Sequence, residues 1–544
     1  MQNTDRLFDF LVIGSGPAGV MAAQTLVESG KQVAMIDVGN QDNHYADLVP
    51  EKDFEELRNT ESSQEEYFLG NSMESIPQEG VKVGAQLSPS RKAMIKDVEQ
   101  WLPIKSDTFT PMESLGLGGL GAGWGLGAYV YSDAELQKAG LDANEMNAAY
   151  QTIAQRIGIS VGDDDATPYL VGMLKGTQAA LKMDNSILQM QAKYQAKKSK
   201  FQKDNIVFGA PSMAFLSEDY QNRKATKYQD LDFYTDHGKS AWRAQYVVEE
   251  LKKQNNFHYI DRHLALRFSE SDSEVHIECI NIDNNSKTEF RGKQLIIATG
   301  PLGSARLLMR SQEKVERLPL LCNPYTYMPG INLSMLGKPL DKNKTSMAQA
   351  MMIYDTTAQH DDLVSVALYT YRSLMLFRLI NESPLGLADS RPLFQYLQSS
   401  FVIAGIHHPD TYSEDKYLML MEDDYSPTGD YLFASYHLNN EEKSRIKQRE
   451  KKIKKALRRM GIYPIKRMDP GAGSSIHYAG TIPFSKEEKL GTQAANGRIH
   501  GTKNVFIADA SGFTYLPAKG ITLSLMANAH RVAKELITQS NSER

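Results

Sequence analysis

The sequence predicts an α/β fold, because one local order occurs at three places in the chain: a short apolar strand, a turn of small residues and a helix. The strands are expected over residues 10–13, 295–298 and 504–508. The helices are expected to begin near Ala18, Arg306 and Ile521. Short apolar runs bounded by such turns are typical of buried strands, and helices cover both faces of a parallel sheet. Since the three places are distant in the sequence, the domain that contains this sheet is discontinuous.

The first of these places carries a glycine turn with a specific spacing. Gly14, Gly16 and Gly19 follow the strand in the pattern GxGxxG. The first glycine permits a tight turn, the second lets the backbone approach a pyrophosphate, and the third lets the following helix lie close against the strand. The pattern therefore predicts a phosphate-binding turn.

The segment after this turn completes a dinucleotide site. The helix expected over residues 18–29 directs unpaired N–H groups at the phosphates, and Ala18 lies in its first turn. An apolar run over residues 33–36 then leads to Asp37, which is placed to bind the ribose hydroxyls. These residues fit NAD and FAD equally well.

Composition restricts the class of protein. With 544 residues and 41% hydrophobic content, the chain is too long for one ordinary core. Its net charge of -5 gives no general attraction to nucleic acid or to an anionic membrane. Cys279 and Cys322 lack the spacing of metal ligands, and no apolar run reaches the ~18 residues that a membrane helix needs. We therefore expect a cytoplasmic protein with no metal site, no nucleic-acid partner and no stable membrane insertion.

The segments between the three places are less regular. Residues 40–110 are polar and are expected to form an irregular flap. Glycines are dense over residues 115–127 around a single large aromatic, Trp124, which favours backbone packed against a flat ligand over a flexible linker. Residues 441–460 are expected to form a basic helix that docks through one apolar side.

Motifs at both ends of the chain and in two central patches resemble those of the glucose-methanol-choline (GMC) family of FAD-dependent oxidoreductases. They cover about a third of the chain, in the family's order. These motifs are the first glycine turn with Asp37, Gly118-Gly119-x-x-x-x-Trp124-Gly125, residues 298–308, Ser475-Ile-His477-Tyr-Ala-Gly480-Thr481, residues 504–511 and residues 517–529.

The resemblance implies two domains and a bound FAD. The Rossmann-like FAD-binding domain would comprise residues 1–160, 236–315 and 465–544. A discontinuous substrate-binding domain, built on a mainly antiparallel sheet, would comprise residues 161–235 and 316–464. FAD would be non-covalent, because Gly123 stands where some relatives carry an anchoring histidine.

The resemblance also assigns positions along FAD. Asp37 would hold the adenosine ribose, and Asp509 would lie near the ribityl-pyrophosphate. The N–H groups of Ile521 and Thr522 would face the flavin N1 and O2, where negative charge develops on reduction. The other residues expected to contact FAD are Gly14, Gly16, Ala18, Gly19, Gly118, Gly119, Gly123, Trp124, Ala265, Thr299, Gly300, Ala510 and Gly520.

His477 matches the catalytic histidine of the family. Alcohol oxidation removes the hydroxyl proton while the carbon transfers a hydride to flavin N5, and an imidazole suits the proton step. The family's second catalytic side chain, Asn or His, is missing because Gly520 occupies its place. Lys519, Tyr478 or a residue of the second domain is expected to replace it.

One pair of histidines in the second domain has two interpretations. His407 and His408 either project into the pocket or cap a strand or loop, and the sequence favours the second interpretation.

We therefore expect an FAD-dependent oxidoreductase that oxidises a CH–OH group of a polar, carbohydrate-like molecule and passes electrons to a separate, unidentified acceptor. Two alternatives stay open: a lyase of the same family, in which His477 acts as a base alone, and a non-catalytic protein that flavin stabilises. NAD as the sole cofactor would leave the carboxyl-terminal motifs without a purpose.

Overall fold

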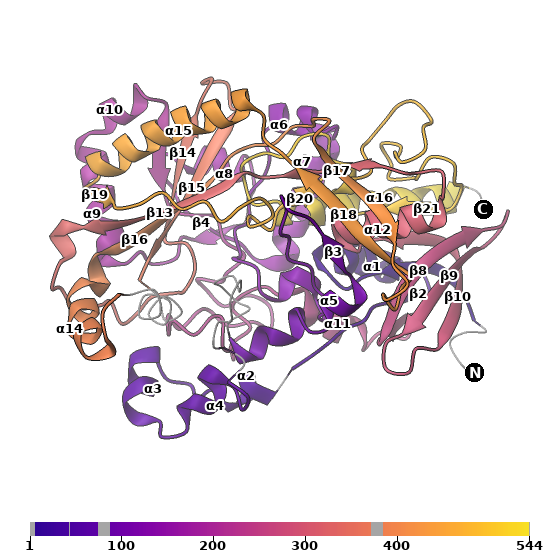
Figure 1. The fold of residues 1–544 in the computed structure, drawn as a ribbon, viewed down its shortest axis with the longest axis horizontal. Helices are drawn as coiled ribbons and strands as arrows, with labels where there is room; N and C mark the ends of the chain where they lie inside the picture. The colour runs from indigo at the N-terminus through magenta and orange to yellow at the C-terminus, as the bar shows by residue number, and fades with distance from the viewer. Residues whose placement is uncertain (1–5, 43, 74, 76–87, 372–383, 543–544) are drawn as a thin grey trace.

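The computed structural model describes residues 6–42, 44–73, 75, 88–371 and 384–542. Two large sheets form its framework, one near the two chain ends and one at the opposite end of the long axis (Figure 1). Smaller strand pairs and helices connect them.

The first sheet has seven strands and is mostly parallel. Its strands are β1 (Leu7–Ile13), β2 (Val33–Ile36), β7 (Phe257–Ile260), β8 (His263–Glu270), β9 (Val275–Asn281), β10 (Lys287–Ile297) and β21 (Val505–Ile507). The order is β7-β2-β1-β10-β9-β8, and β21 pairs with β10. The strands β7, β2, β1, β10 and β21 are parallel, whereas β9 and β8 continue the sheet antiparallel. The predicted α/β fold is confirmed.

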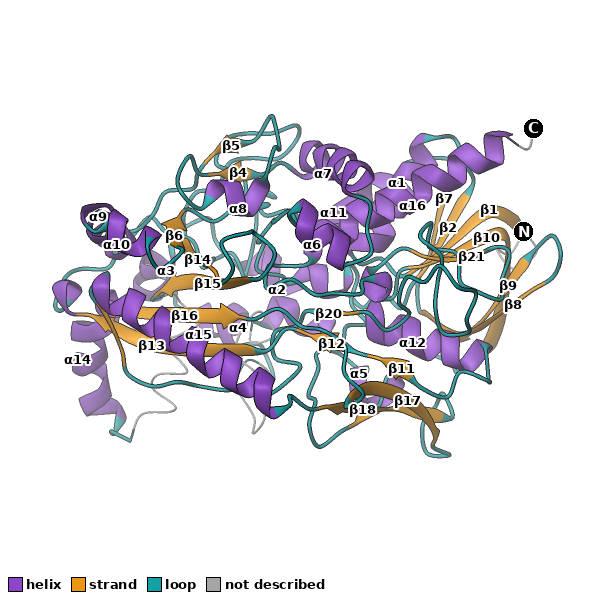
Figure 2. Cartoon of the chain, turned by 90° about the horizontal axis from the view of Figure 1, so that it is seen from above, coloured by secondary structure: helices purple, strands orange, loops and turns teal. Residues whose placement is uncertain are grey.

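Helices cover both faces of this sheet because successive residues of β1 point to opposite sides. The helices concerned are α1 (Pro17–Glu28), α7 (Ala143–Ile157), α11 (Ala244–Leu251), α12 (Gly300–Ser311) and α16 (Thr522–Ser542). Phe10 and Val12 pack in one core with α1, α7, α11 and α16. Leu11 and Ile13 pack in a second core with α12, which lies across the sheet from α1 and α16 (Figure 2).

The helix after β10 begins earlier than the sequence indicated. We expected its start near Arg306, but α12 begins at Gly300. Gly300 has a positive φ of 76°, which glycine adopts without strain, and Pro301 follows in the first turn, where its missing N–H costs no hydrogen bond. The turn between strand and helix is therefore only about two residues long.

The second sheet has six antiparallel strands in the order β19-β13-β16-β15-β14-β6. They are β6 (Ile206–Gly209), β13 (Tyr325–Asn332), β14 (Ala350–Asp355), β15 (Leu363–Thr370), β16 (Phe401–His407) and β19 (Ile462–Pro464). The mainly antiparallel second sheet is as predicted, while the domain boundaries themselves stay a prediction.

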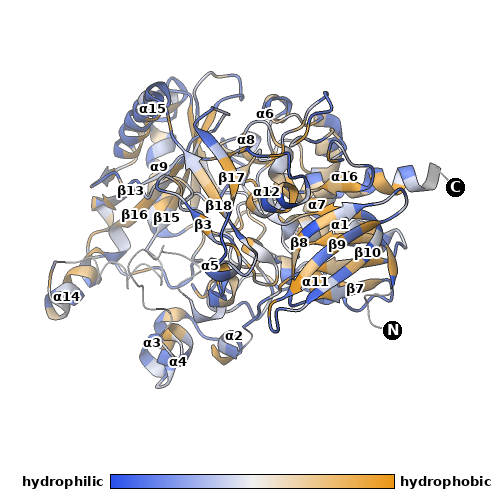
Figure 3. Cartoon of the chain, turned by 45° about the vertical axis from the view of Figure 1, so that its right-hand side comes forward, coloured by the Kyte–Doolittle hydropathy of each residue, from blue (hydrophilic) through white to orange (hydrophobic). Residues whose placement is uncertain are grey.

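Two helices cover the outer face of the second sheet. They are α9 (Asn185–Ala196) and α15 (Asn440–Arg459), and the buried side chains Met190, Tyr194, Ile453 and Leu457 join them to the strands in one core. The opposite side of α15 is hydrophilic (Figure 3). The amphipathic interpretation of this basic helix therefore agrees with its packing.

Residues 40–110 are more ordered than an irregular flap. Their described part contains α2 (His44–Leu48), α3 (Phe54–Thr60), α4 (Gln64–Leu69), a 3₁₀ helix (Pro89–Met94), α5 (Val98–Trp101) and β3 (Ile104–Lys105). The Asp53 carboxylate caps α3 by accepting from the N–H of Glu56. Tyr67, Phe68 and Trp101 are buried. The polar composition hid these short helices because each one buries only one to three residues.

The remaining elements are small. Strands β11 (Leu318–Pro319), β17 (Lys416–Glu422), β18 (Asp430–Tyr436) and β3 form one sheet. Two further pairs join β12 (Leu321–Cys322) to β20 (Tyr478–Ala479) and β4 (Ser160–Val161) to β5 (Gln178–Ala179). The other helices are α6 (Asp133–Lys138), α8 (Thr167–Val171), α10 (Lys198–Gln202) and α14 (Leu387–Leu397).

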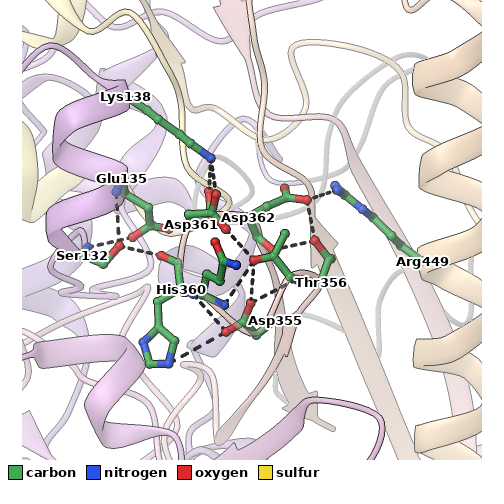
Figure 4. A network of polar contacts seen from close by, with 11 residues as sticks. Ser132, Glu135, Lys138, Asp355, Thr356, His360, Asp361, Asp362 and Arg449 are labelled. Atoms are coloured by element: carbon green, nitrogen blue, oxygen red, sulfur yellow. Dashed lines mark hydrogen bonds and ion pairs between the residues drawn. The ribbon is translucent and has the colours of Figure 1, made fainter.

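A polar network joins α6, the β14–β15 connection and α15 (Figure 4). Ser132, which caps α6, donates to the carbonyl oxygen of His360 over 2.7 Å, and Lys138 Nζ lies 2.9 Å from Asp361 Oδ2. Asp362 pairs with Arg449 of α15. These contacts connect the second sheet to the segment that leads from the glycine-rich residues 115–127 into α7.

No helix within the described residues is both long enough and apolar enough to cross a bilayer.

Candidate active site

A cavity of about 530 Å³ lies between the two large sheets. Its lining includes the carboxyl end of β1, the starts of α1, α12 and α16, and residues of β13 to β16. Cavities of this size at such a junction are typical ligand sites.

Most of the residues selected from the sequence line this cavity. They are Gly14, Gly16, Ala18, Asp37, Gly119, Gly123, Trp124, Ala265, Thr299, Gly300, His477, Asp509, Gly520, Ile521 and Thr522. Gly19, Gly118, Ala510 and Lys519 do not line it. Gly118 lies just behind, where its N–H donates to Ser15 Oγ over 2.8 Å, and Ala510 begins a short 3₁₀ helix.

Three helices begin at the cavity. Gly16 precedes α1, Gly300 opens α12, and α16 starts at Thr522. A Cβ atom added at Gly16 or at Gly300 would meet no atom within 4 Å, so the backbone there is accessible from the cavity. Unpaired N–H groups and the positive ends of the helix dipoles make this region suitable for an anion.

The first and last glycines of the turn, Gly14 and Gly19, have no room for a side chain. A Cβ atom at Gly14 would lie 2.8 Å from the Ala298 carbonyl oxygen, and one at Gly19 would lie 1.9 Å from the Gly14 carbonyl oxygen. Gly14 also has a positive φ of 96°. Gly19 therefore acts from beneath the cavity, by letting α1 approach the turn.

Asp37 lies at the end of β2 beside the glycine turn. Its carboxylate accepts hydrogen bonds from Ser15 Oγ and, over 3.0 Å, from the Tyr259 hydroxyl. Burial raises the pKa of Asp37 to about 6. Ser15 links Asp37 to the N–H of Gly118, so the glycine-rich segment is tied to the first turn. Sequence reasoning missed Ser15 and Tyr259, although Ser15 stands inside the GxGxxG pattern.

The Asp509 carboxylate is used to organise the start of α12. It accepts from Ser304 Oγ over 2.6 Å and from the N–H and hydroxyl of Ser511. Burial raises its pKa. Asp509 thus positions the cavity wall through its carboxylate.

His477 lines the same cavity as Asp37, and its ring is held by Asn323. The His477 Nδ1 and Asn323 Oδ1 atoms are 3.1 Å apart. Asn323 Nδ2 donates to the carbonyl oxygens of His408 and Pro517, over 2.8 and 3.0 Å, so Asn323 Oδ1 acts as the acceptor. His477 Nδ1 therefore carries the proton, and Nε2 keeps a lone pair. Burial lowers the pKa of His477 to about 4.

Two different family models match the two ends of the chain, and each match contains part of the site. The pyridine nucleotide-disulphide oxidoreductase family model matches residues 8–104, which contain the glycine turn and Asp37. The GMC oxidoreductase family model matches residues 435–529, which contain His477, Asp509 and the start of α16. Together these two matches support a GMC oxidoreductase. A search of the curated proteins gives no significant match.

The fold resembles that of a solved structure. The crystal structure of pyridoxine 4-oxidase from Mesorbium loti superposes with a TM-score of 0.58 and 14% sequence identity, over 97% of this chain and 99% of that chain. At this identity the match concerns the fold.

FAD is the cofactor of the GMC oxidoreductases, and the cavity of this chain fits it. A pyrophosphate could bind where the three helices begin, because the backbone is accessible at Gly16 and Gly300. The close packing at Gly14 and Gly19 keeps the turn in the shape that this site needs. The glycine-rich segment with Trp124 lines the same cavity. The carboxyl-terminal match leaves NAD as sole cofactor without support.

Lys519 does not face the cavity. Its Nζ atom lies 2.7 Å from Glu135 Oε2 and donates to the Val130 carbonyl oxygen over 3.0 Å. Both charged side chains are buried. The expectation that Lys519 could replace the missing catalytic side chain therefore disagrees with its position, because its ammonium group is paired with Glu135.

Tyr478 was another candidate for this role. Its hydroxyl is already used as a donor, to the Gly473 carbonyl oxygen over 2.7 Å.

The second sheet contributes an uncharged end to the cavity. Ser365, Ala367 and Tyr369 alternate along β15 and line the cavity, together with Tyr325 of β13 and Met351 of β14. The charged lining residues, Asp37, Glu113, Arg306, Arg310 and Asp509, belong to the first sheet, to α12 or to the loops beside them. Within the described residues, the part of the lining that the second sheet supplies has methyl, aromatic, sulfur, hydroxyl and imidazole groups and no carboxylate, ammonium or guanidinium group.

Proposed function

We propose that this GMC oxidoreductase oxidises the CH–OH group of a small uncharged alcohol, with FAD bound non-covalently and with His477 as the proton acceptor. The observation that carries the proposal is the fixed ring of His477, whose Nδ1 faces Asn323 while the side chain lines the cavity. When bound, FAD supplies the two-electron acceptor and takes a hydride at flavin N5.

The role proposed for His477 follows from its protonation state. Because burial lowers the pKa of His477 to about 4, the ring is neutral at ordinary pH and its Nε2 can accept the hydroxyl proton of the alcohol. Asn323 fixes the ring plane and the tautomer. The proton therefore leaves the substrate oxygen for His477 as the C–H bond loses its electron pair.

The residues proposed to hold FAD follow the cavity wall. Gly14, Gly16 and Ala18 would bind the pyrophosphate, and Asp37 the adenosine ribose. The N–H groups of Ile521 and Thr522, at the start of α16, would stabilise negative charge that develops on reduction. We propose contacts along the rest of FAD from Gly119, Gly123, Trp124, Ala265, Thr299, Gly300, Asp509 and Gly520.

The lining supports a flat, uncharged substrate more than a carbohydrate-like one. Tyr129, Tyr325, Tyr369, Met347 and Met351 offer apolar faces, whereas a sugar needs several polar partners. Pyridoxine 4-oxidase, by its name, acts on such a ring-bearing alcohol. We therefore propose an aromatic or heteroaromatic hydroxymethyl compound, without a charged group, as the substrate class.

Anaerobic mixing tests this proposal. Neutral aromatic alcohols, aliphatic alcohols, sugars and anionic aromatic alcohols are added to the purified protein while flavin absorbance is followed. Bleaching by the neutral aromatic alcohols at the lowest concentrations is expected. Bleaching by sugars alone would contradict the substrate class, and turnover of a compound without bleaching would favour the lyase alternative. A biological role that survives His477→Ala would favour the non-catalytic alternative.

The same samples identify the acceptor class. Admitting air to the bleached protein should restore flavin absorbance within one turnover time for an oxidase. Much slower restoration, with rapid recovery on adding a quinone-type dye, is the result expected for a dehydrogenase that uses a separate acceptor.

The acid limb of the pH profile should follow His477. In the unmodified protein, kcat/KM is expected to fall only as the pH approaches about 4, where His477 gains its proton and can no longer accept one. In Asn323→Asp, a carboxylate beside Nδ1 stabilises the imidazolium, so the limb should move up by roughly 1–3 pH units. The rate at pH 8 should change far less than the rate at pH 5. An unchanged limb would show that His477 is not the group that titrates.

A further inference from the structure

The place of the missing family side chain is closed. A Cβ atom at Gly520 would lie 3.2 Å from Tyr129 Cδ2 and 3.3 Å from the Gly127 carbonyl oxygen. Tyr129 is buried, and its ring lies across this segment. A side chain at position 520 would therefore have to displace Tyr129 and would press on a backbone carbonyl. Since Lys519 is bound to Glu135, no charged or amide side chain at positions 519–520 reaches the substrate.

A second imidazole lies beside His477 instead. His407 ends β16 and lines the cavity. Its ring centroid is 5.1 Å from that of His477, and the two ring planes differ by 25°. The rings come from different parts of the fold, since β16 belongs to the second sheet and His477 precedes β20.

The second sheet fixes the position of His407. In the strand register, His407 lies opposite Tyr325 of β13 and Ser365 of β15, and all three line the cavity. The His407 and Tyr325 rings are 4.6 Å apart. Two residues earlier on the same strand face, Gly405 leaves room for the Tyr325 ring, because a Cβ atom there would lie 2.9 Å from the Tyr325 hydroxyl oxygen.

The two neighbouring histidines of this strand end differ. His408 is buried with its Nε2 atom 3.9 Å from Glu450 Oε1, away from the cavity. His407 is partly exposed to the cavity, and within the described residues its ring nitrogens make no hydrogen bond to the protein. One of the two nitrogens of a neutral imidazole carries a proton. His407 therefore presents an unused N–H donor and an unused acceptor to a ligand.

We propose that His407 replaces the absent side chain at position 520 by donating a hydrogen bond to the substrate oxygen while His477 takes the hydroxyl proton. This inference rests on the proposed function. The O–H bond of the alcohol breaks and its proton goes to His477 Nε2. The hydrogen of the C–H bond leaves with both bonding electrons, as a hydride for which the bound cofactor would be the acceptor, and the carbonyl forms. The oxygen carries partial negative charge during this exchange, and the His407 N–H stabilises it.

Electrostatics agrees with a neutral donor. Burial, with the adjacent His477 and His408 rings, lowers the pKa of His407 well below its ordinary value. Two imidazoles 5.1 Å apart repel if both are charged, so His477 is the only charged ring of the pair once it has accepted the hydroxyl proton. His407 then remains a neutral donor throughout the exchange.

The test compares two substitutions at His407 in the purified flavoprotein, with Ile403→Val on the same strand as the matched control. The limiting rate of anaerobic flavin reduction by the best alcohol is measured, with flavin content and melting temperature for each variant. His407→Leu should lower the limiting rate by about 10²–10³-fold, because it removes one donor to the developing oxyanion. His407→Gln should recover most of the rate, since its amide keeps an N–H donor. The alcohol concentration for half-maximal rate should change little.

Each outcome decides the inference. Equal rates for His407→Leu and the unmodified protein overturn it. Equally slow leucine and glutamine variants with normal flavin content also overturn it, because shape rather than hydrogen bonding then matters, and loss of flavin in both variants indicates a structural role. An unmodified protein that no alcohol bleaches overturns the proposed function instead, a result visible before any variant is made.

Discussion

Replacing His477 by alanine is expected to slow anaerobic flavin reduction by about 10²–10⁴-fold and to leave the flavin spectrum and content unchanged. The reason is chemical: the alcohol must lose its hydroxyl proton, and His477 Nε2 is the neutral acceptor that Asn323 orients at the end of the cavity. Stopped-flow absorbance with a saturating neutral aromatic alcohol measures the rate. His276→Ala, at a surface histidine paired with Glu289, is the matched control and should reduce at the unmodified rate.

Two results would contradict this assignment. A His477→Ala variant that reduces as fast as the unmodified protein would place the proton acceptor elsewhere. A variant that loses flavin and unfolds would assign His477 a structural role, and His477→Asn, which keeps a polar side chain beside Asn323, would then show whether the rate falls in a folded protein.

Lys519→Met is expected to destabilise the protein by about 3–5 kcal/mol, the second large effect. The side chains of Lys519 and Glu135 are 2% and 0% exposed, so removing the ammonium group leaves a buried carboxylate without its counter-ion. Glu135 also caps α6 through the N–H of Ser132, so its displacement would loosen the network around that helix. Urea unfolding followed by circular dichroism and by flavin fluorescence measures the loss.

The control is the same substitution in an ion pair that is exposed instead of buried. Lys253→Met removes a partner of Glu250 at the surface, where both side chains are more than half exposed, and should change the free energy of unfolding by less than about 1 kcal/mol. The double variant Lys519→Met, Glu135→Leu should recover much of the lost stability, because no unpaired charge remains. A Lys519→Met variant with unchanged stability but abolished flavin reduction would restore Lys519 as a substrate-contacting residue.

The cofactor half of the site could be predicted because its signals are local. Gly14, Gly16, Gly19 and Asp37 follow one another within a single strand–turn–helix–strand unit, and each spacing has a direct geometric meaning. Even here Tyr259, which binds Asp37, was missed, since it reaches Asp37 only through the pairing of β7 with β2.

The substrate half could not be predicted, because it depends on strand register between distant segments. His407 lies opposite Tyr325 and Ser365 only when three antiparallel strands pair in the observed register. A shift of one residue would turn His407 to the other face and His408 toward the cavity. The sequence shows both histidines side by side and contains no local signal to choose between them.

Lys519 also shows that contacts between distant segments cannot be predicted from local sequence. It lies next to Gly520 in a family motif, so proximity in sequence suggested a catalytic role. Its partner Glu135 is 384 residues away along the chain. Only the ion pair between Glu135 of α6 and the segment before α16 reveals that the ammonium group is used inside the protein.

The most direct test of the central claim is the absorption spectrum of the purified protein, before and after precipitation with trichloroacetic acid. We expect oxidised flavin bands in the native protein and yellow FAD in the supernatant after precipitation. This result follows if FAD binds without a covalent bond to the glycine turn, the three helix starts and the glycine-rich segment. Colour that stays with the pellet would contradict non-covalent binding. Protein without flavin bands, even after incubation with FAD, would contradict the assignment of the cavity as a whole.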